Sequence, residues 1–278
     1  MIDTLYVEDS GTGTPILAIH GLGGGAWFFT ELARELGHQY RLLAVDLTGT
    51  GRSAGTPTIN AWITDLAAVI AARTEEPVVL LGHSMGTIVA LEAWRAWPRR
   101  IRALVLAGGL PRVRPAIRER LSQRIAALDG ASSLAGWGPR VSPGVFSPAT
   151  ARDHPEIVSH FERCFESETV DRYLRCTRIL LDADASHLAP TVTVPTLVVT
   201  GADDQYAPPD LVEPFAATIP GATCEVVPSS GHLPFLEQPT AFAVFVDFDL
   251  DCYFATDHAL TQLGVNRIAL SSQRRVLN

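Results

Sequence analysis

The chain reads VVLLGHSMGTIVALEAWRAW from Val78 to Trp97, which is an apolar run, a serine between glycines and a helix-like stretch. Gly82, Ser84 and Gly86 form the pattern G-x-S-x-G, which between a strand and a helix is typical of a nucleophile elbow. Such a turn exposes the serine hydroxyl and places the next backbone N–H at a helix start. Glycines are needed on both sides because side chains there would collide with the neighbouring strand and helix. The stretch predicts a serine nucleophile.

Around this stretch, short apolar runs alternate with helix-length segments, the pattern of a mostly parallel sheet with helices on both faces. The expected strands are Pro15–His20, Arg41–Asp46, Val78–Gly82, Ile101–Ala107, Pro195–Gly201 and Cys224–Val227, with Leu5–Glu8 as an antiparallel edge strand. The expected helices are Trp27–Leu36, Ile59–Ala72, Thr87–Trp97 and Leu211–Ala217. The sequence therefore predicts an α/β fold.

The alternation stops between Pro111 and Pro190, where no comparable strand-like run occurs. An all-helical insertion explains this, forming a lid over the carboxyl ends of the strands, where open α/β sheets bind ligands. We therefore expect a core of residues 1–110 and 191–246, a helical lid of residues 111–190, and a C-terminal extension, 247–278, whose role the sequence leaves open.

Charge and composition exclude several classes of function. The net charge of −8 argues against a nucleic-acid partner and against acidic membranes. All 22 basic residues are arginine, which excludes Schiff-base chemistry and Walker-type phosphate loops, because both need a lysine. The four cysteines form no C-x-x-C pattern, no signal peptide is visible, and no apolar run reaches the roughly 18 residues of a membrane span. We expect a cytoplasmic protein of undetermined oligomeric state.

A serine nucleophile needs a general base, which in turn needs a carboxylate to orient it. Chains with this elbow supply them in the order Ser, Asp or Glu, then His. His232 follows the last expected strand and therefore falls at the carboxyl edge of the sheet, whereas the other downstream histidines fall in the lid or the tail. Asp203 and Asp204 both follow the preceding strand, and only one of them can face the imidazole.

Acyl transfer by such a serine also needs N–H donors for the developing oxyanion, each worth about 3–4 kcal/mol. We expect the N–H of Met85 to be one donor and the N–H of Leu22, in the glycine-rich loop after His20, to be the other. A phosphate-binding loop is the alternative for this segment, but it lacks the lysine and the Mg²⁺-binding hydroxyl. No metal or cofactor is expected, because the chain has no H-E-x-x-H and no tight His/Cys cluster.

These motifs together resemble the α/β-hydrolase superfamily over about residues 1–246. They are, in order, His20-Gly21, Asp46–Ser53, the elbow, Gly201–Pro208 and Gly231-His232. The family pattern G-x-x-D-x-x-x-P selects Asp204 over Asp203, so the resemblance implies a triad of Ser84, Asp204 and His232. In the family's D-x-x-G-x-G-x-S segment, Thr48 and Thr50 replace the more usual proline and histidine, which we expect to affect loop packing more than catalysis.

The lid resembles the caps of 3-oxoadipate enol-lactonase-like enzymes and related small esterases, at Phe146-Ser147-Pro148, Arg163, Tyr173 and Leu181–Asp184. This resemblance implies hydrolysis of a small carboxylic ester or lactone. One alternative is a carbon–carbon bond hydrolase of meta-cleavage type, with Arg163, Arg172 or Arg175 binding a carboxylate. Those enzymes typically have a tryptophan soon after the catalytic histidine, where this chain reads Leu233-Pro234-Phe235. The other alternative is a receptor-like member that binds a small ligand under the lid.

Three side chains are candidate substrate contacts. Trp27 follows the oxyanion loop, Trp137 falls in a lid loop, and Arg163 falls in the lid. The arginines from Arg112 to Arg124 are interpreted as a solvated helix face, with attraction of an anionic substrate as the alternative.

Overall fold

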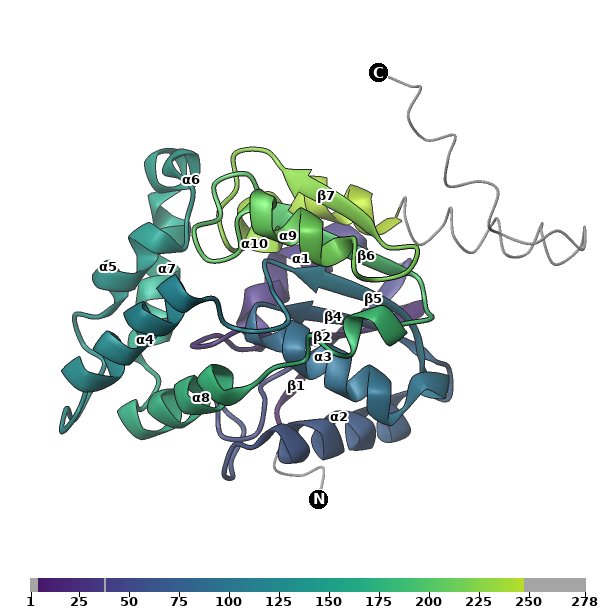
Figure 1. Cartoon of the computed structure of the whole chain (residues 1–278), viewed down its shortest axis with the longest axis horizontal. Coiled ribbons are helices and arrows are strands. Elements are labelled where there is room, and N and C mark those ends of the chain that lie inside the picture. The colour runs from purple at the N-terminus through teal and green to yellow at the C-terminus, as the bar shows by residue number, and fades with distance from the viewer. Residues whose placement is uncertain (1–4, 38, 248–278) are drawn as a thin grey trace, which may run out of the picture.

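The structure, a computed structural model, describes residues 5–37 and 39–247 (Figure 1). Within these residues, seven strands form one sheet in the order β1-β3-β2-β4-β5-β6-β7, in which β1 runs antiparallel to β3 and all other pairs are parallel. The strands are β1 Val7–Gly11, β2 Thr14–Ile19, β3 Tyr40–Val45, β4 Val78–His83, β5 Ile101–Ala107, β6 Thr196–Gly201 and β7 Thr223–Val227. The predicted α/β fold is confirmed, and the edge strand lies two residues later than expected at its start.

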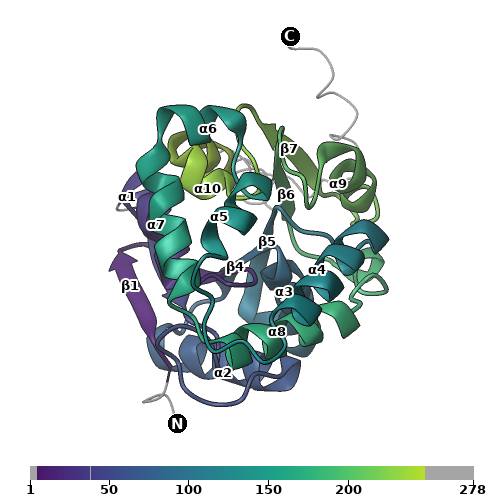
Figure 2. The ribbon, with the colours of Figure 1, turned by 90° about the vertical axis from the view of Figure 1, so that its left-hand side faces the viewer.

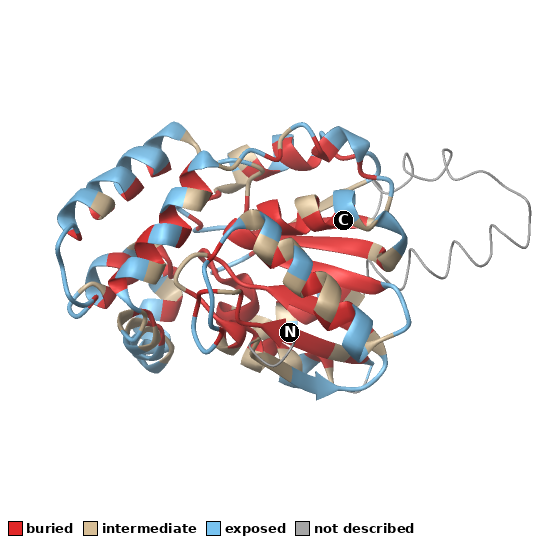
Figure 3. Ribbon diagram, turned by 90° about the horizontal axis from the view of Figure 1, so that it is seen from below, coloured by how far each residue is buried: buried red, intermediate tan, exposed pale blue. Residues whose placement is uncertain are grey.

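The parallel strands are apolar over nearly their whole length because helices cover both faces of the sheet. Leu17 and Ile19 of β2 enter one apolar core, while Ile16 and Ala18 enter the other, as the alternation of side chains along a strand requires. Figure 3 shows the buried strands between helices whose outer sides are exposed. The covering helices are η1 Ala26–Phe29, α1 Thr30–Leu36, α2 Ile59–Arg73, α3 Met85–Ala96, η2 Pro98–Arg100, α9 Pro209–Ala216 and α10 Pro234–Glu237.

The sheet changes its direction of winding at β2, which lies between β3 and β4. At such a reversal the loops after the two parallel strands diverge and leave a crevice at their carboxyl ends, where α/β proteins bind ligands. The pairing of Ile19 with Gly82 brings the loop that begins at His20 beside the turn at Ser84. The topology therefore brings together the two segments that the sequence assigns to the oxyanion site and the nucleophile.

The segment between β5 and β6 is helical, and this part of the prediction is confirmed. Figure 1 shows α4 to α8 gathered on one side of the molecule, and Figure 2 looks onto that side. Prolines occupy the first turns of α4, α6 and α7, where a missing N–H costs nothing. The helices are α4 Pro115–Ala127, α5 Gly138–Val141, η3 Ser142–Gly144, α6 Pro148–Asp153, α7 Pro155–Glu166, α8 Val170–Asp182 and η4 Ala189–Thr191.

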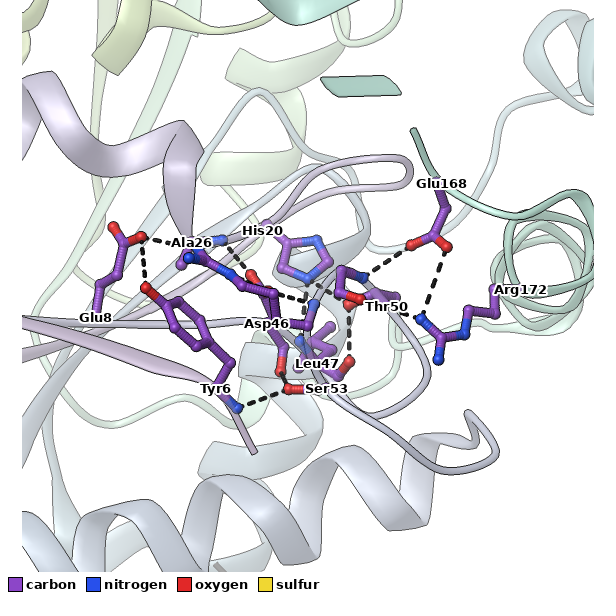
Figure 4. Close-up of polar contacts among 12 residues, drawn as sticks. Tyr6, Glu8, His20, Ala26, Asp46, Leu47, Thr50, Ser53, Glu168 and Arg172 are labelled. Atoms are coloured by element: carbon purple, nitrogen blue, oxygen red, sulfur yellow. Dashed lines mark hydrogen bonds and ion pairs between the residues drawn. The ribbon is translucent and has the colours of Figure 1, made fainter. Parts of the chain in front are cut away.

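The loop after β3 ties the helical insertion to the sheet (Figure 4). The Asp46 carboxylate accepts hydrogen bonds from the backbone N–H of Ala26 at 2.7 Å and of Arg52 at 2.8 Å, which fixes the loop. The N–H of Gly51 donates to the Glu168 carboxylate at 2.8 Å, and the Arg172 guanidinium donates to the Gly51 carbonyl at 3.1 Å. Glu168 and Arg172 belong to the insertion, which is therefore anchored at this corner.

The two threonines of this loop make local contacts. The Thr50 hydroxyl lies 3.1 Å from Nε2 of His20 and donates to the Leu47 carbonyl at 2.7 Å, while the Thr48 hydroxyl donates to Asp65. Burial lowers the pKa of His20, so its ring is neutral, and its other nitrogen lies 2.7 Å from the Gly21 carbonyl. Thr50 thus helps to hold the histidine that supports the oxyanion loop.

The described residues contain no helix long and apolar enough to cross a membrane. Cys164, Cys176 and Cys224 form no disulfide. Of the expected C-terminal extension, all but residue 247 lies outside the described residues.

Candidate active site

Ser84 occupies the turn between β4 and α3 in a conformation that serine rarely adopts. Its φ is 52° and its ψ is −113°, so the backbone is strained at this residue. A Cβ on Gly82 would lie 2.3 Å from the Gly86 carbonyl oxygen, and one on Gly86 would lie 2.3 Å from that of Ile19. The close approach of strand, turn and helix therefore accounts for both glycines of the pattern, for the reason inferred from the sequence.

Three side chains from three loops form one chain of hydrogen bonds. Nε2 of His232 lies 3.0 Å from Oγ of Ser84, and Nδ1 of His232 lies 2.9 Å and 3.1 Å from the two carboxylate oxygens of Asp204. An ionised carboxylate can only accept, so Nδ1 carries the proton and Nε2 presents its lone pair to the serine hydroxyl. The structure thus brings Ser84, His232 and Asp204 together, whereas Asp203 is exposed on the same turn.

The environment of Asp204 keeps it ionised. Its side chain is buried, and this burial works to raise the pKa of the carboxyl. The imidazole of His232 and the backbone N–H groups of Ala207 and Tyr206, which donate at 2.9 Å and 2.7 Å, outweigh the burial and hold the pKa of Asp204 below its usual value. A charged, fixed Asp204 can orient the imidazole and stabilise it once it is protonated.

The loop that carries His232 is fixed by a buried carboxylate that the sequence reading missed. Glu237, from α10, accepts from the N–H of Gly231 and from the N–H of Ser147, both at 2.8 Å. The N–H of His232 donates to the Val145 carbonyl at 2.7 Å. The histidine loop is therefore held between α10 and the helical insertion, and no local sequence pattern marks Glu237 for this role.

Two backbone N–H groups remain for an oxyanion. Met85 is the first residue of α3, where the N–H has no partner within the helix and the helix dipole favours negative charge. Gly21, one residue before Leu22, approaches so closely that a Cβ on it would lie 2.9 Å from Cβ of Ser84. Among the described residues, neither the N–H of Leu22 nor that of Met85 donates a hydrogen bond to the protein. Both predicted donors are thus near the serine and available to a ligand.

His83 is a second histidine at the site that the sequence reading passed over, although it is a variable position of the elbow pattern. Its Nε2 lies 2.9 Å from the carbonyl oxygen of His232, its ring stands edge-on to the His232 ring, and its Nδ1 is buried without a partner among the described residues. Burial, followed by the proximity of His232, lowers the pKa of His83 well below its usual value. His83 is therefore a neutral donor that supports the histidine loop from below.

A cavity of about 100 Å³ lies between the insertion and the sheet and reaches Ser84 and His232. Its lining is mostly apolar, and the ring of Tyr206 lies 4.7 Å from the ring of His232. The insertion lines the cavity from α4, α5, α7 and α8, with Leu121, Val141, Phe161 and Tyr173 among the lining residues. The charged side chains of the lining are all arginines: Arg112, Arg114 and Arg124.

Arg124 corrects one interpretation from the sequence. Most arginines of this segment are exposed, as a solvated face requires, but Arg124 is only 9% exposed. It follows Ile117 and Leu121 at helical spacing, on the face of α4 that packs inward. The position of Arg124 at helical spacing from two apolar residues was therefore the sequence signal that could have predicted its burial.

The three candidate substrate contacts lie outside the lining of this cavity. Trp27 packs edge-on against Phe28 and His160. Trp137 lines a separate, outer hollow with Arg140, whose guanidinium lies 5.0 Å from the indole. Arg163 is exposed on α7. Within the described ranges, no group of three or more His, Cys, Asp or Glu residues could hold a metal ion.

Comparison with known proteins identifies the family of the chain. A family model described as the alpha/beta hydrolase family matches residues 16–244. The chain belongs to this family. A Caulobacter sp. (strain K31) protein named "Putative carbamate hydrolase RutD" is 31% identical over 258 residues, covering 87% of this chain and 93% of the relative. The pimeloyl–acyl-carrier protein methyl ester esterase of Stenotrophomonas maltophilia is 29% identical over 244 residues, covering 84% of this chain and 91% of the relative.

Solved structures place this α/β-hydrolase among similar folds. A thermophilic esterase from Thermogutta terrifontis, solved with malate bound, superposes with a TM-score of 0.81 at 29% identity, covering 89% of this chain and 93% of the esterase. The enol-lactonase from Burkholderia xenovorans LB400 superposes with a TM-score of 0.80 at 20% identity, covering 89% and 96%. The second likeness shows the shared fold alone.

Proposed function

We propose that this α/β-hydrolase cleaves a small carboxylic ester or lactone through an acyl-enzyme on Ser84. The observation that carries the proposal is the unbroken chain of hydrogen bonds from Oγ of Ser84 through His232 to the buried Asp204. The strained turn at Ser84 and the two available N–H groups beside it support the same chemistry. Esterases among its relatives and structural neighbours support the substrate class.

In the proposed acylation step, Oγ of Ser84 attacks the substrate carbonyl carbon while Nε2 of His232 takes the hydroxyl proton. The carbonyl π electrons move to the oxygen, where the N–H groups of Leu22 and Met85 stabilise the negative charge. Asp204 stabilises the imidazolium through Nδ1–H and stays ionised. The intermediate then collapses, and the bond to the leaving alkoxide breaks as Nε2 returns the proton to it.

Deacylation repeats these roles with water. His232 removes a proton from a water molecule, whose oxygen attacks the acyl carbon, and Ser84 leaves with the proton from Nε2. In a lactone the leaving oxygen stays attached to the acyl group, so one hydroxy acid is released. We also propose that residues 111–190 form the lid over a core of residues 1–110 and 191–246.

A carbamate is the second candidate substrate, because relatives carry the name carbamate hydrolase. Its carbonyl carbon accepts the same serine attack, and the same two N–H groups would face the oxyanion. The carbon–carbon hydrolase and the receptor-like alternatives remain proposals that the experiment below separates.

The test compares wild type with Ser84→Ala on p-nitrophenyl acetate and butyrate, with Ser122→Ala as a matched control on the exposed face of α4. We expect Ser84→Ala to lower kcat by about 10⁴-fold or more, as removal of the nucleophile does in other triad enzymes. A fluorophosphonate probe should label Ser84 in wild type and in Ser122→Ala, as read by mass spectrometry of the peptides.

Turnover that survives Ser84→Ala, or absence of label on Ser84 in wild type, would overturn the proposal. Hydrolysis of a vinylogous diketone faster than of either ester would establish the carbon–carbon alternative. Ligand binding without turnover in wild type would establish the receptor-like alternative.

A further inference from the structure

Arg124 is a buried cation at the lid end of the cavity. It projects from α4, is 9% exposed, and lines the same cavity as Ser84 and His232. Its Nη1 donates to the hydroxyl of Tyr173 at 2.7 Å, and it also interacts with the hydroxyl of Tyr206. The two tyrosines come from α8 and from the loop after β6, so the guanidinium lies where insertion and core meet.

No carboxylate in the described part of the chain neutralises this charge. Of the acidic side chains that the structure describes, none lies within 4.0 Å of the Arg124 nitrogens, although many other arginines have such partners. Burial raises the pKa of Tyr173, so its hydroxyl stays neutral and contributes no negative charge. A buried charge without a counter-charge costs several kcal/mol, which a protein offsets only when something else gains from it.

The other two cavity arginines have partners of their own. Arg114 donates to the backbone carbonyls of Tyr206 and Gln205, and Arg112 is exposed near Asp184. No aspartate or glutamate is among the lining residues of the cavity. Arg124 is therefore the buried guanidinium of the lining, and the partners recorded for it among the described residues are two neutral tyrosine hydroxyls, in a chain whose net charge is −8.

A second, outer hollow of about 520 Å³ adjoins the cavity, and its lining also contains arginines. Arg124, Val141 and Tyr206 line both spaces, so Arg124 lies on the wall between them. The outer hollow adds Arg120 and Arg140, and its lining also contains no acidic residue. The guanidinium groups of Arg120 and Arg140 would attract an anion to this hollow, whose wall also includes Arg124.

We propose that Arg124, together with the hydroxyls of Tyr173 and Tyr206, binds a carboxylate of the substrate, so that the preferred ester is an anionic one such as the monoester of a dicarboxylic acid. This rests on the proposed ester hydrolysis at Ser84. A guanidinium binds a carboxylate through two parallel N–H···O bonds, and a phenol hydroxyl can add a third. Ser84 and Arg124 then hold the two ends of one substrate.

The test measures kcat/KM of wild type for paired esters. The monomethyl esters of succinate, glutarate and adipate are each compared with the methyl ester of the corresponding monoamide, which has the same shape without the charge. A second series compares acetate esters of hydroxy acids with their amides, for a carboxylate on the alcohol side. We expect wild type to prefer the acid in one series by about 10- to 100-fold, the range for a hydrogen bond to a charged group.

Variants assign the preference to Arg124. Arg124→Met should bring the ratio of kcat/KM for the acid to kcat/KM for the amide close to one, and Arg124→Lys should restore part of the preference for the acid. Arg178→Met is the matched control, since Arg178 is an exposed arginine of the same insertion and lies outside both linings. If Arg124→Met does not fold, two measurements still test the carboxylate site. One is the ratio of kcat/KM for acid and amide esters in wild type. The other is the affinity for glutarate, titrated into Ser84→Ala and into the double variant Ser84→Ala/Arg124→Lys.

Each outcome has one meaning. Equal rates on acids and amides in both series, with Ser84 labelled by the fluorophosphonate, would overturn the carboxylate site and leave the hydrolase intact. A preference for acids that persists in Arg124→Met would also overturn it. Absence of hydrolysis in every pair, with Ser84 unlabelled, would overturn both proposals.

Discussion

The two walls of the cavity differ in kind. The core wall, formed by the loops after β2, β4, β5, β6 and β7, supplies every group that the proposed reaction needs, from Ser84 to His232. The lid wall, to which α4, α5, α7 and α8 contribute, supplies aromatic and aliphatic surface and one buried cation, Arg124. The core wall is built from strained turns and fixed hydrogen bonds, whereas the lid wall is built from packed side chains.

This difference separates chemistry from selectivity. A change on the core wall should affect all substrates alike, because every substrate passes through the same oxyanion and the same base. A change on the lid wall should alter the ratio between substrates and leave the best of them fast. Substitutions on the two walls test this separation of roles.

Asp204→Asn should lower kcat more than the other core-wall and lid-wall substitutions that follow. The amide cannot hold the required tautomer of His232, so kcat should fall by about 10³- to 10⁴-fold for every ester tested. Asp203→Asn is the matched control, since its side chain is exposed on the same turn, and it should stay within a few-fold of wild type. The measurement is steady-state hydrolysis of two esters of different size. Reversed effects would mean that the neighbouring aspartate holds the imidazole.

Gly21→Ala should give the next largest loss. The added Cβ would lie 2.8 Å from Nδ1 of His83 and 2.9 Å from Cβ of Ser84, which forces the oxyanion loop away from the nucleophile. Since one oxyanion donor is worth about 10²- to 10³-fold in kcat, we expect a fall of about 10²-fold with little change in KM.

The control for Gly21→Ala is Gly130→Ala in the insertion, where a Cβ meets nothing within 4 Å. It should lower stability through its positive φ, read as a lower Tm, and leave kcat unchanged. A loss of kcat in the control would mean that loop strain far from Ser84 reaches the site.

Phe161→Leu tests the lid wall. Phe161 lines the cavity, and the smaller side chain should raise kcat/KM for longer acyl chains relative to acetate by about 10-fold, since one carbon in a pocket is worth that order. Phe146→Leu is the control. The ring centroids of Phe146 and Phe161 lie 5.3 Å apart, but Phe146 is outside the lining of the cavity. If Phe161→Leu lowered kcat/KM for all esters equally, the lid wall would affect catalysis as well as selectivity, and the two walls would not have separate roles.

The core wall was predictable from sequence because backbone geometry dictates its residues. The elbow at Ser84 needs Gly82 and Gly86, and the loops after parallel strands must meet at one edge, so spacing alone located His232 and the pair Asp203 and Asp204. The resemblance to known hydrolases was needed to choose between the two aspartates. Strand positions followed from the same logic, since a strand buried on both faces is a short apolar run.

The lid wall was predicted only as helices. Five arginines between positions 112 and 124 look alike in a sequence, and tertiary packing decides that only Arg124 is buried. Trp27 was proposed because it follows the oxyanion loop, and Trp137 because it falls in a lid loop, but neither residue is in the lining of the cavity. Glu237 was missed because Ser147 and Thr150, two of its partners, come from the distant insertion, and no short pattern encodes such a contact.

The smallest predicted effect compares two buried carboxylates that hold the His232 loop and differ in the sign of their pKa shift. Asp204 faces an imidazole, and its pKa lies below the usual value; Glu237 faces only neutral donors, so burial raises its pKa. At a pH between the pKa of Asp204 in the folded chain and its higher pKa in the unfolded chain, the unfolded chain binds more protons at this residue. The contribution of Asp204 to the free energy of unfolding is therefore lost as the pH falls through this window. Glu237 binds more protons in the folded chain, so its contribution falls as pH rises above its usual value.

Urea unfolding of wild type, Asp204→Asn and Glu237→Gln between about pH 2.5 and 7 should therefore give opposite slopes, since the Asp204 window lies below its usual pKa. The free energy of unfolding of wild type minus that of Asp204→Asn should grow as pH rises from its acid end, while the difference for Glu237→Gln should shrink. Neither slope can exceed about 1.4 kcal/mol per pH unit, the limit for one proton. Slopes of the same sign would mean that Glu237 has a charged partner in solution. The conclusion that only neutral donors surround its carboxylate would then be wrong.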